Sequence, residues 1–154
     1  MAQFQKLPGF VEHLAHGVHN FNTSGNGGHQ LKVALSNTAP SAESTPPSGT
    51  TAACVLANVT QINYTNGSLS SRDLSISGTA QAAGVYKLSI TDLVISASTT
   101  TSDQFRYIYV YNDTPTSPTD PLIGYYDYGA SITLQPSDTF TIDFDSVNGV
   151  LTLT

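Results

Sequence analysis

The segment FRYIYVYNDTP, residues 105–115, decides how the rest of the chain can fold. Its aromatic side chains fall on every second position, and Ile108 and Val110 lie between them. Alternation with a period of two indicates a β-strand, and apolar bulk on both sides indicates that both faces are covered. We expect Ile108 and Val110 to face the core, because they carry no polar atom. The other face, covered by an N-terminal helix or by a partner protein, is expected to hold Phe105, Tyr107, Tyr109 and Tyr111.

Segments with strand character fill the C-terminal half of the chain, residues 72–154, and residues 31–36 alternate like a half-buried strand. Turn-forming residues separate the segments; Tyr128-Gly129 is one such turn, and Asn148-Gly149 predicts a type I′ hairpin. The pattern predicts a mainly β fold, an antiparallel β-sandwich that is jelly-roll-like. The expected strands span 72–80, 84–91, 93–98, 104–112, 121–128, 130–135, 138–145 and 149–154.

A single helix is expected at residues 4–19, outside this β pattern. Gly17 ends it, and loops follow at 20–30 and 37–52; the second is rich in Pro, Ser and Thr. Residues 53–63 fit a short helix and a strand equally well. The length favours a single domain, residues 1–154. The apolar stripe of the helix consists of Phe4, Leu7, Val11, Leu14, Ala15 and Val18.

Composition argues against several classes of partner. Charged residues make up only 10% of the chain, the net charge is −6, and the five basic residues are scattered. We therefore expect no nucleic-acid partner, because phosphate binding needs clustered Lys or Arg. Cys54 is the single cysteine, which excludes an internal disulfide. The sequence contains no apolar run of transmembrane length and its N-terminus lacks the pattern of a secretory signal, so we expect no membrane association.

Candidate chemistry is sparse. Of the four histidines, His13, His16, His19 and His29, the first three are spaced three apart, as in the ligand pairs of zinc sites. No H-E-x-x-H motif or Cys pair supplies the remaining ligands, so no metal or cofactor is expected. Asp143 and Asp145 share one side of a strand, opposite Phe140, Ile142 and Phe144, so we expect them to face solvent or a partner. Paired catalytic carboxylates need a cleft, and no nucleophile or phosphate-binding motif accompanies them. We expect no catalytic residue and no enzyme activity.

Several segments resemble a family of small structural proteins encoded by tailed bacteriophages. They include FVEHLAHGVHNF, LKVALSNTAP and most of the chain from Phe105 onward. The most specific pieces are Tyr111-Asn112-Asp113-Thr114 with Pro121-Leu122-Ile123-Gly124, and Asn148-Gly149-Val150-Leu151-Thr152-Leu153. Residues 41–102 match only in general character. The resemblance implies a place in the phage particle, assembled in the host cytoplasm, and no catalytic residues.

Together these expectations describe a virion structural protein, in the first place a capsid decoration (cement) protein that stabilises the major-capsid lattice. Its partners would be the major capsid protein or other virion proteins, and a homo-oligomer is expected. The alternatives are a tail, neck or fibre component, and a carbohydrate-binding or adhesin module on the particle surface that uses Tyr125, Tyr126 and Tyr128 as stacking platforms. The candidate interface residues are Phe4, Leu7, Val11, Leu14, Tyr107, Tyr109, Tyr111, Tyr125, Tyr126 and Tyr128.

Overall fold

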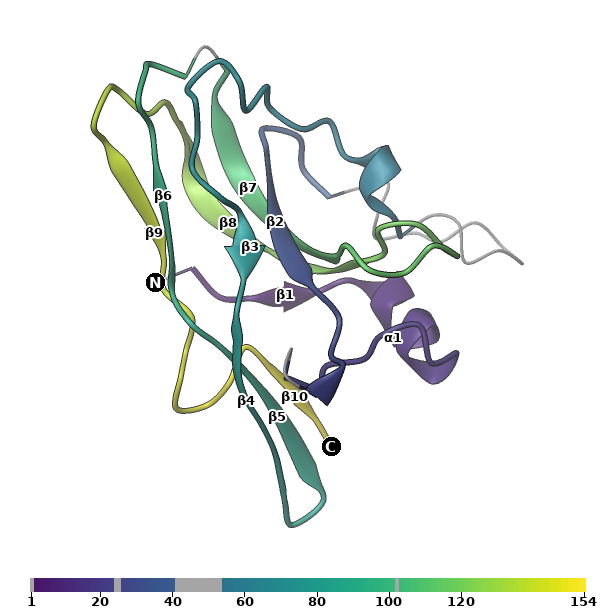
Figure 1. Cartoon of the computed structure of the whole chain (residues 1–154). Coiled ribbons are helices and arrows are strands. Elements are labelled where there is room, and N and C mark those ends of the chain that lie inside the picture. The colour runs from purple at the N-terminus through teal and green to yellow at the C-terminus, as the bar shows by residue number, and fades with distance from the viewer. Residues whose placement is uncertain (1, 24–25, 41–53, 102) are drawn as a thin grey trace.

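The computed structural model describes residues 2–23, 26–40, 54–101 and 103–154, so most of the predicted 37–52 loop lies outside the described residues. The described chain is mainly β, with antiparallel sheets and one α-helix, as the sequence predicts (Figure 1). Its elements are β1 (Gln5–Lys6), α1 (Pro8–Ala15), β2 (Leu31–Ser36), the 3-10 turn η3 (Leu56–Asn58), β3 (Asp73–Leu74), β4 (Ile76–Ala82), β5 (Val85–Ile90), β6 (Leu93–Ser96), β7 (Phe105–Asn112), β8 (Leu122–Ile132), β9 (Thr139–Ile142) and β10 (Leu151–Leu153).

The largest sheet has five strands in the order β1-β8-β7-β2-β3, and β7 is its central strand. The antiparallel register sets Val110 opposite Val33 of β2, and Ile108 opposite Leu35 of β2 and Tyr126 of β8. These five side chains are buried and belong to one hydrophobic cluster, the main core. The prediction that Ile108 and Val110 face the core is therefore confirmed.

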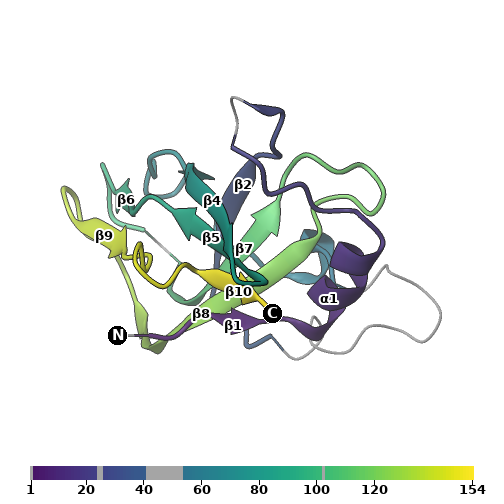
Figure 2. The same cartoon turned by 90° about the horizontal axis from the view of Figure 1, so that it is seen from below.

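The main core also receives side chains from two smaller sheets, β10-β5-β4 and β6-β9. Figure 2 shows β4 and β5 across from β8 and β1, with β10 between them in the view from below. The contributions of the smaller sheets include Leu88 of β5, Ile95 of β6, Ile142 of β9 and Leu151 of β10. Burial of each such side chain contributes roughly 1.5–3 kcal/mol before chain entropy is subtracted.

A second, smaller cluster covers the opposite face of the five-stranded sheet. Tyr109 is fully buried there, and its hydroxyl donates a hydrogen bond to the carbonyl of Thr38 at 2.8 Å. The sequence predicts a more peripheral place for this ring; full burial is tolerated because the hydroxyl has an acceptor inside the chain. Ala34 also lies on this face, so β2 is buried on both sides and not half-buried. The cluster comprises Leu7, Ala34, Cys54, Leu56, Val59, Tyr109, Tyr111 and Leu122.

The N-terminal helix is shorter than the predicted 4–19 at both ends: the residues before it form a strand, and it ends at Ala15, two residues before Gly17 with its positive φ of 72°. Gln5 and Lys6 pair with β8 at Tyr125 and Gly124, and the helix starts only at Pro8. A side chain at position 124 would collide with the backbone oxygen of Gln5, so glycine is needed for this close approach. The predicted apolar stripe is also wrong in part. Phe10 and His13 are buried, whereas Val11 is exposed.

Asn148-Gly149 does not form the predicted hairpin. β9 pairs with β6 and β10 pairs with β5, so the two strands that flank the turn are not partners of each other. Gly149 does have a positive φ of 82°, as a glycine at such a turn allows. The turn is held instead by Asp145, whose carbonyl and carboxylate accept hydrogen bonds from Gly149 and Asn148.

β8 runs without a break through the predicted turn at Tyr128-Gly129. Gly129 takes a φ of 92° inside the strand, and its N–H donates to the carboxylate of Asp127. The register against β7 shifts across this region, which is the mark of a β-bulge. The same irregularity moves Phe105 into the main core and not onto the face of Tyr109, where simple alternation puts it.

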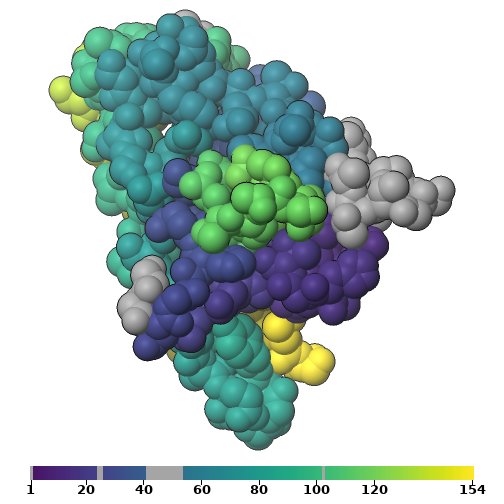
Figure 3. All heavy atoms as spheres, turned by 45° about the vertical axis from the view of Figure 1, so that its right-hand side comes forward, coloured from purple at the N-terminus to yellow at the C-terminus, as the bar shows by residue number. Residues whose placement is uncertain are grey.

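The surface beside α1 is formed by segments distant in sequence. Figure 3 shows the loop that follows β7, in green, lying against α1, in purple. Residue Thr114 of this loop accepts a hydrogen bond from the backbone of Gln30 at 2.8 Å. The loop therefore lies against α1 and is bonded to the residue that precedes β2.

Candidate binding groove

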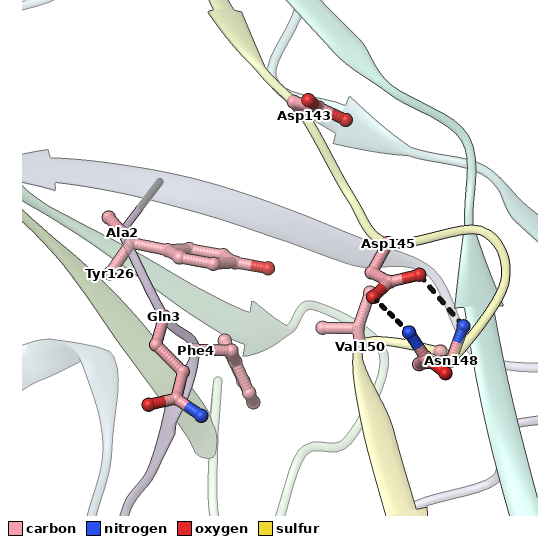
Figure 4. A pocket seen from close by; sticks show the side chains of 9 residues that line it. Ala2, Gln3, Phe4, Tyr126, Asp143, Asp145, Asn148 and Val150 are labelled. Carbon is pink, nitrogen blue, oxygen red and sulfur yellow. Dashed lines mark hydrogen bonds between the residues drawn. The ribbon is translucent and has the colours of Figure 1, made fainter.

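A cavity of about 450 Å³ opens where the start of the chain meets the segment that follows β9 (Figure 4). Ala2, Gln3 and Phe4 form one wall, and β8 forms the floor with Tyr126. The volume lies within the range of small-ligand pockets. The remaining wall is formed by Asp143, Asp145, Asn148, Gly149 and Val150.

The floor of the cavity is aromatic. The Tyr126 ring lies 5.2 Å from the Phe4 ring and 5.9 Å from Phe144, measured between centroids. Tyr126 is only 8% exposed, yet no hydrogen bond from the described residues reaches its hydroxyl. Burial, with the nearby charges of Asp143 and Asp145, raises the pKa of Tyr126 above its ordinary value. In Figure 4 the hydroxyl points from β8 toward the segment that carries both carboxylates.

The two carboxylates of the cavity differ in their roles. Asp145 accepts hydrogen bonds from the backbone of Val147 and Asn148 and from the Asn148 side chain, at 2.7–2.9 Å. These bonds, strongest from Asn148, lower the pKa of Asp145. The carboxylate of Asp143 has no hydrogen bond or ion pair with the described residues. Asp143 is therefore the carboxylate with its acceptor positions open to a ligand.

A second, apolar cavity of about 190 Å³ adjoins the first and shares Ala2, Tyr126 and Asp143 with it. Its other residues come from β7, β8 and β9. Tyr128 lies over Phe140 at 5.7 Å between centroids and is still 52% exposed. We call the two cavities together the groove. Within the described residues, β9 pairs only with β6, so the other edge of β9 is free beside the groove. In the same part of the chain, β8 pairs beyond Tyr125 only with β7, so its other edge is also free there.

The sequence predicts part of the groove. Asp143 and Asp145 are exposed whereas Ile142 and Phe144 are buried, which confirms the prediction that the carboxylates face outward. Sequence reasoning did not find the contribution of Ala2 and Gln3, since the pairing of β1 with β8 brings them from the far end of the chain.

The candidate interface residues are dispersed by the fold. Leu7, Tyr109, Tyr111 and Tyr126 are buried inside the chain, and only Val11 and Tyr128 are largely exposed. Tyr125 and Tyr126 belong to different clusters on opposite faces of β8, so Tyr125, Tyr126 and Tyr128 do not form one stacking platform. Phe4, Leu14, Tyr107 and Tyr125 are partly buried. Of the ten, Phe4, Tyr126 and Tyr128 line the groove.

Histidines form a separate polar cluster behind α1. The side-chain amide of Asn112 lies 3.1 Å from Nδ1 of His19 and 3.0 Å from Nδ1 of His29, within hydrogen-bond distance of both rings. Nε2 of His19 is buried without a hydrogen-bond partner. Burial, followed by the proximity of His13 and His29, lowers the pKa of His19 to about 3. His19 is therefore neutral near pH 7.

The described residues also bear on metal binding and membrane insertion. No group of three His, Cys, Asp or Glu side chains comes together there to hold a metal ion. No helix in that part of the chain is long and apolar enough to span a membrane. Comparison of the chain with protein-family models, with curated proteins and with solved structures found no match.

Proposed function

We propose that the chain is an accessory structural protein of a tailed-bacteriophage virion, and that it binds the other virion proteins through the groove. The observation that carries the proposal is the groove itself, where free strand edges, exposed Tyr128 and the open carboxylate of Asp143 meet. Free strand edges beside side-chain pockets suit the capture of an extended protein segment. The resemblance of residues 105–154 to phage structural proteins supports the same role.

Within the virion, we propose capsid decoration. The protein would bind the outside of the major-capsid lattice, as a homo-oligomer, and stabilise the lattice against the pressure of the packaged DNA. Many repeated contacts would act together, so each one can be weak. The two hydrophobic clusters support a rigid scaffold for such contacts, and we infer from the main core, shared between opposed sheets, a jelly-roll-like β-sandwich.

Copy number tests this role. Quantitative mass spectrometry of purified virions of the encoding phage should find hundreds of copies, in a fixed ratio to the major capsid protein. A copy number of only a handful or a dozen would contradict capsid decoration and favour a tail, neck or fibre component. Absence from the particle would refute the virion role altogether.

A second candidate function is carbohydrate binding on the particle surface. One observation favours it: the rings of Phe4 and Tyr126 line a cavity together with the carboxylate of Asp143, and sugars are bound by such pairs of apolar and polar groups. Titration of the isolated protein with a panel of neutral monosaccharides and disaccharides tests it. Saturable binding that Asp143→Asn weakens would favour this function over decoration.

A further inference from the structure

We infer that the acidic end of the groove binds the guanidinium group of an arginine, which a partner protein presents in an extended segment. The inference deepens the proposed function and rests on it in one respect, that the arginine belongs to a virion protein. The pocket itself is a property of the isolated chain.

Unused hydrogen-bond acceptors argue for a ligand rich in N–H groups. The cavity holds the carboxylate of Asp143, which accepts nothing from the described residues, and the free hydroxyl of Tyr126. Tyr126 is more than nine-tenths buried and lines the cavity, and its hydroxyl points toward the segment that carries Asp143 and Asp145 (Figure 4). None of the described residues that line the cavity is a Lys or Arg that could neutralise Asp143. A cationic donor is the complement of this arrangement.

The aromatic floor distinguishes a guanidinium from other cations. The guanidinium group is planar, stacks on aromatic faces and donates several N–H groups in one plane, whereas an ammonium is a compact and strongly hydrated charge. The Tyr126 ring supplies an aromatic face in the cavity that Asp143 also lines, and the Phe4 ring packs against it at an interplanar angle of 57°. A calcium ion needs six to eight oxygen ligands, and Asp145 is already engaged by its own turn.

The adjoining apolar cavity fits the rest of an extended segment. Tyr128 and Phe140 offer an exposed apolar surface next to the acidic cavity, and the free edge of β9 lies alongside. An extended chain added at a strand edge directs alternate side chains into such pockets. From Asp103 onward the sequence has seven acidic residues and one basic residue, so the surface favours a basic segment over an acidic one.

The test is an NMR titration of the isolated protein with N-acetyl-arginine amide. Its matched ligand control is N-acetyl-citrulline amide, which has nearly the same shape and no charge, and N-acetyl-lysine amide tests the choice of cation. We expect the arginine probe to shift the amide resonances of residues 143–150 and to bind at least about tenfold more tightly than citrulline. Equal binding of arginine and citrulline, or tighter binding of lysine, would overturn the inference.

Three variants locate the site. Asp143→Asn should weaken arginine binding about tenfold, since the charge is lost with little change of shape. Tyr126→Phe should weaken it severalfold, because the free hydroxyl is removed and the ring is kept. Glu12→Gln, which removes one charge on α1, should leave binding unchanged. Full binding by both Asp143→Asn and Tyr126→Phe would place the site elsewhere and overturn the inference.

This titration uses no virion, so it separates the two proposals. Arginine binding by a protein that is absent from particles would refute the proposed function alone. Virion incorporation without arginine binding would refute this inference alone.

Discussion

Acidification should destabilise the fold through one buried side chain, His19. The pKa of His19 is about 3 in the folded chain, against an ordinary value of 6.5 in the unfolded chain. The unfolded chain therefore takes up the proton first, and the stability that neutral His19 gives is complete above pH 6.5 and is lost as the pH falls toward 3. Linkage with these two values gives a loss of about 2 kcal/mol between about pH 8 and about pH 5.

Urea unfolding followed by circular dichroism at about pH 8, 7, 6 and 5 measures this loss. His19→Asn is the informative variant, because an asparagine oxygen can replace Nδ1 as the acceptor for Asn112 and does not titrate. His16→Asn is the matched control, since His16 is exposed. We expect the parent and His16→Asn to lose about 2 kcal/mol more than His19→Asn over this range.

The chosen pH range separates His19 from the carboxylates. Asp127 and Asp145 have pKa values lowered from 3.8 by their hydrogen bonds, to Arg106 and to Asn148 respectively, so their contribution is lost only at more acidic pH. The reasoning is refuted if His19→Asn loses as much stability between about pH 8 and about pH 5 as the parent does.

Three substitutions test the packing, each by urea unfolding at neutral pH. Gly149→Val should cost about 1 kcal/mol or more, because it forces a positive φ on a β-branched residue, whereas Gly78→Val, with open space and no positive φ, should cost clearly less; equal costs would contradict the backbone argument. Phe10→Ala should cost about 3–5 kcal/mol and Val11→Ala under about 0.5, and the reverse order would return the helix to its predicted orientation. Tyr109→Phe should cost about 1 kcal/mol through the lost hydrogen bond to a backbone carbonyl, and an unchanged midpoint would contradict that bond.

The parts of the fold that local alternation controls could be predicted from the sequence. The β2 and β7 strands lie where the pattern puts them, and Ile108 and Val110 face the main core. The second cluster could not be predicted in this way, because the cover over Tyr109 comes from residues 54–59, whose own pattern is ambiguous. Strand pairing is non-local, and the residues of a turn do not determine which strands the two flanking strands will pair with.

The errors at turns and at the N-terminus have the same origin. Asn148-Gly149 has the composition of a hairpin turn, but the side chain of Asp145 organises the chain there and β9 and β10 find other partners. Gln5 and Lys6, at the start of the predicted helix, form β1 instead, because Gly124 of β8 leaves room for their backbone. The outward direction of Asp143 was predictable; its meeting with Phe4 and Tyr126 was not.

The order of strands in the five-stranded sheet also constrains how the chain can be made. Leu31 of β2 pairs with Asn112, and Gln5 of β1 pairs with Tyr125. The first strands therefore cannot pair until residues far later in the sequence have been synthesised. A ribosome must release β7 and β8 before the N-terminal residues can join the sheet. Such long-range pairing is typical of slow folding, and we expect the nascent N-terminal half, with its apolar β2 exposed, to depend on holding factors until synthesis is nearly complete.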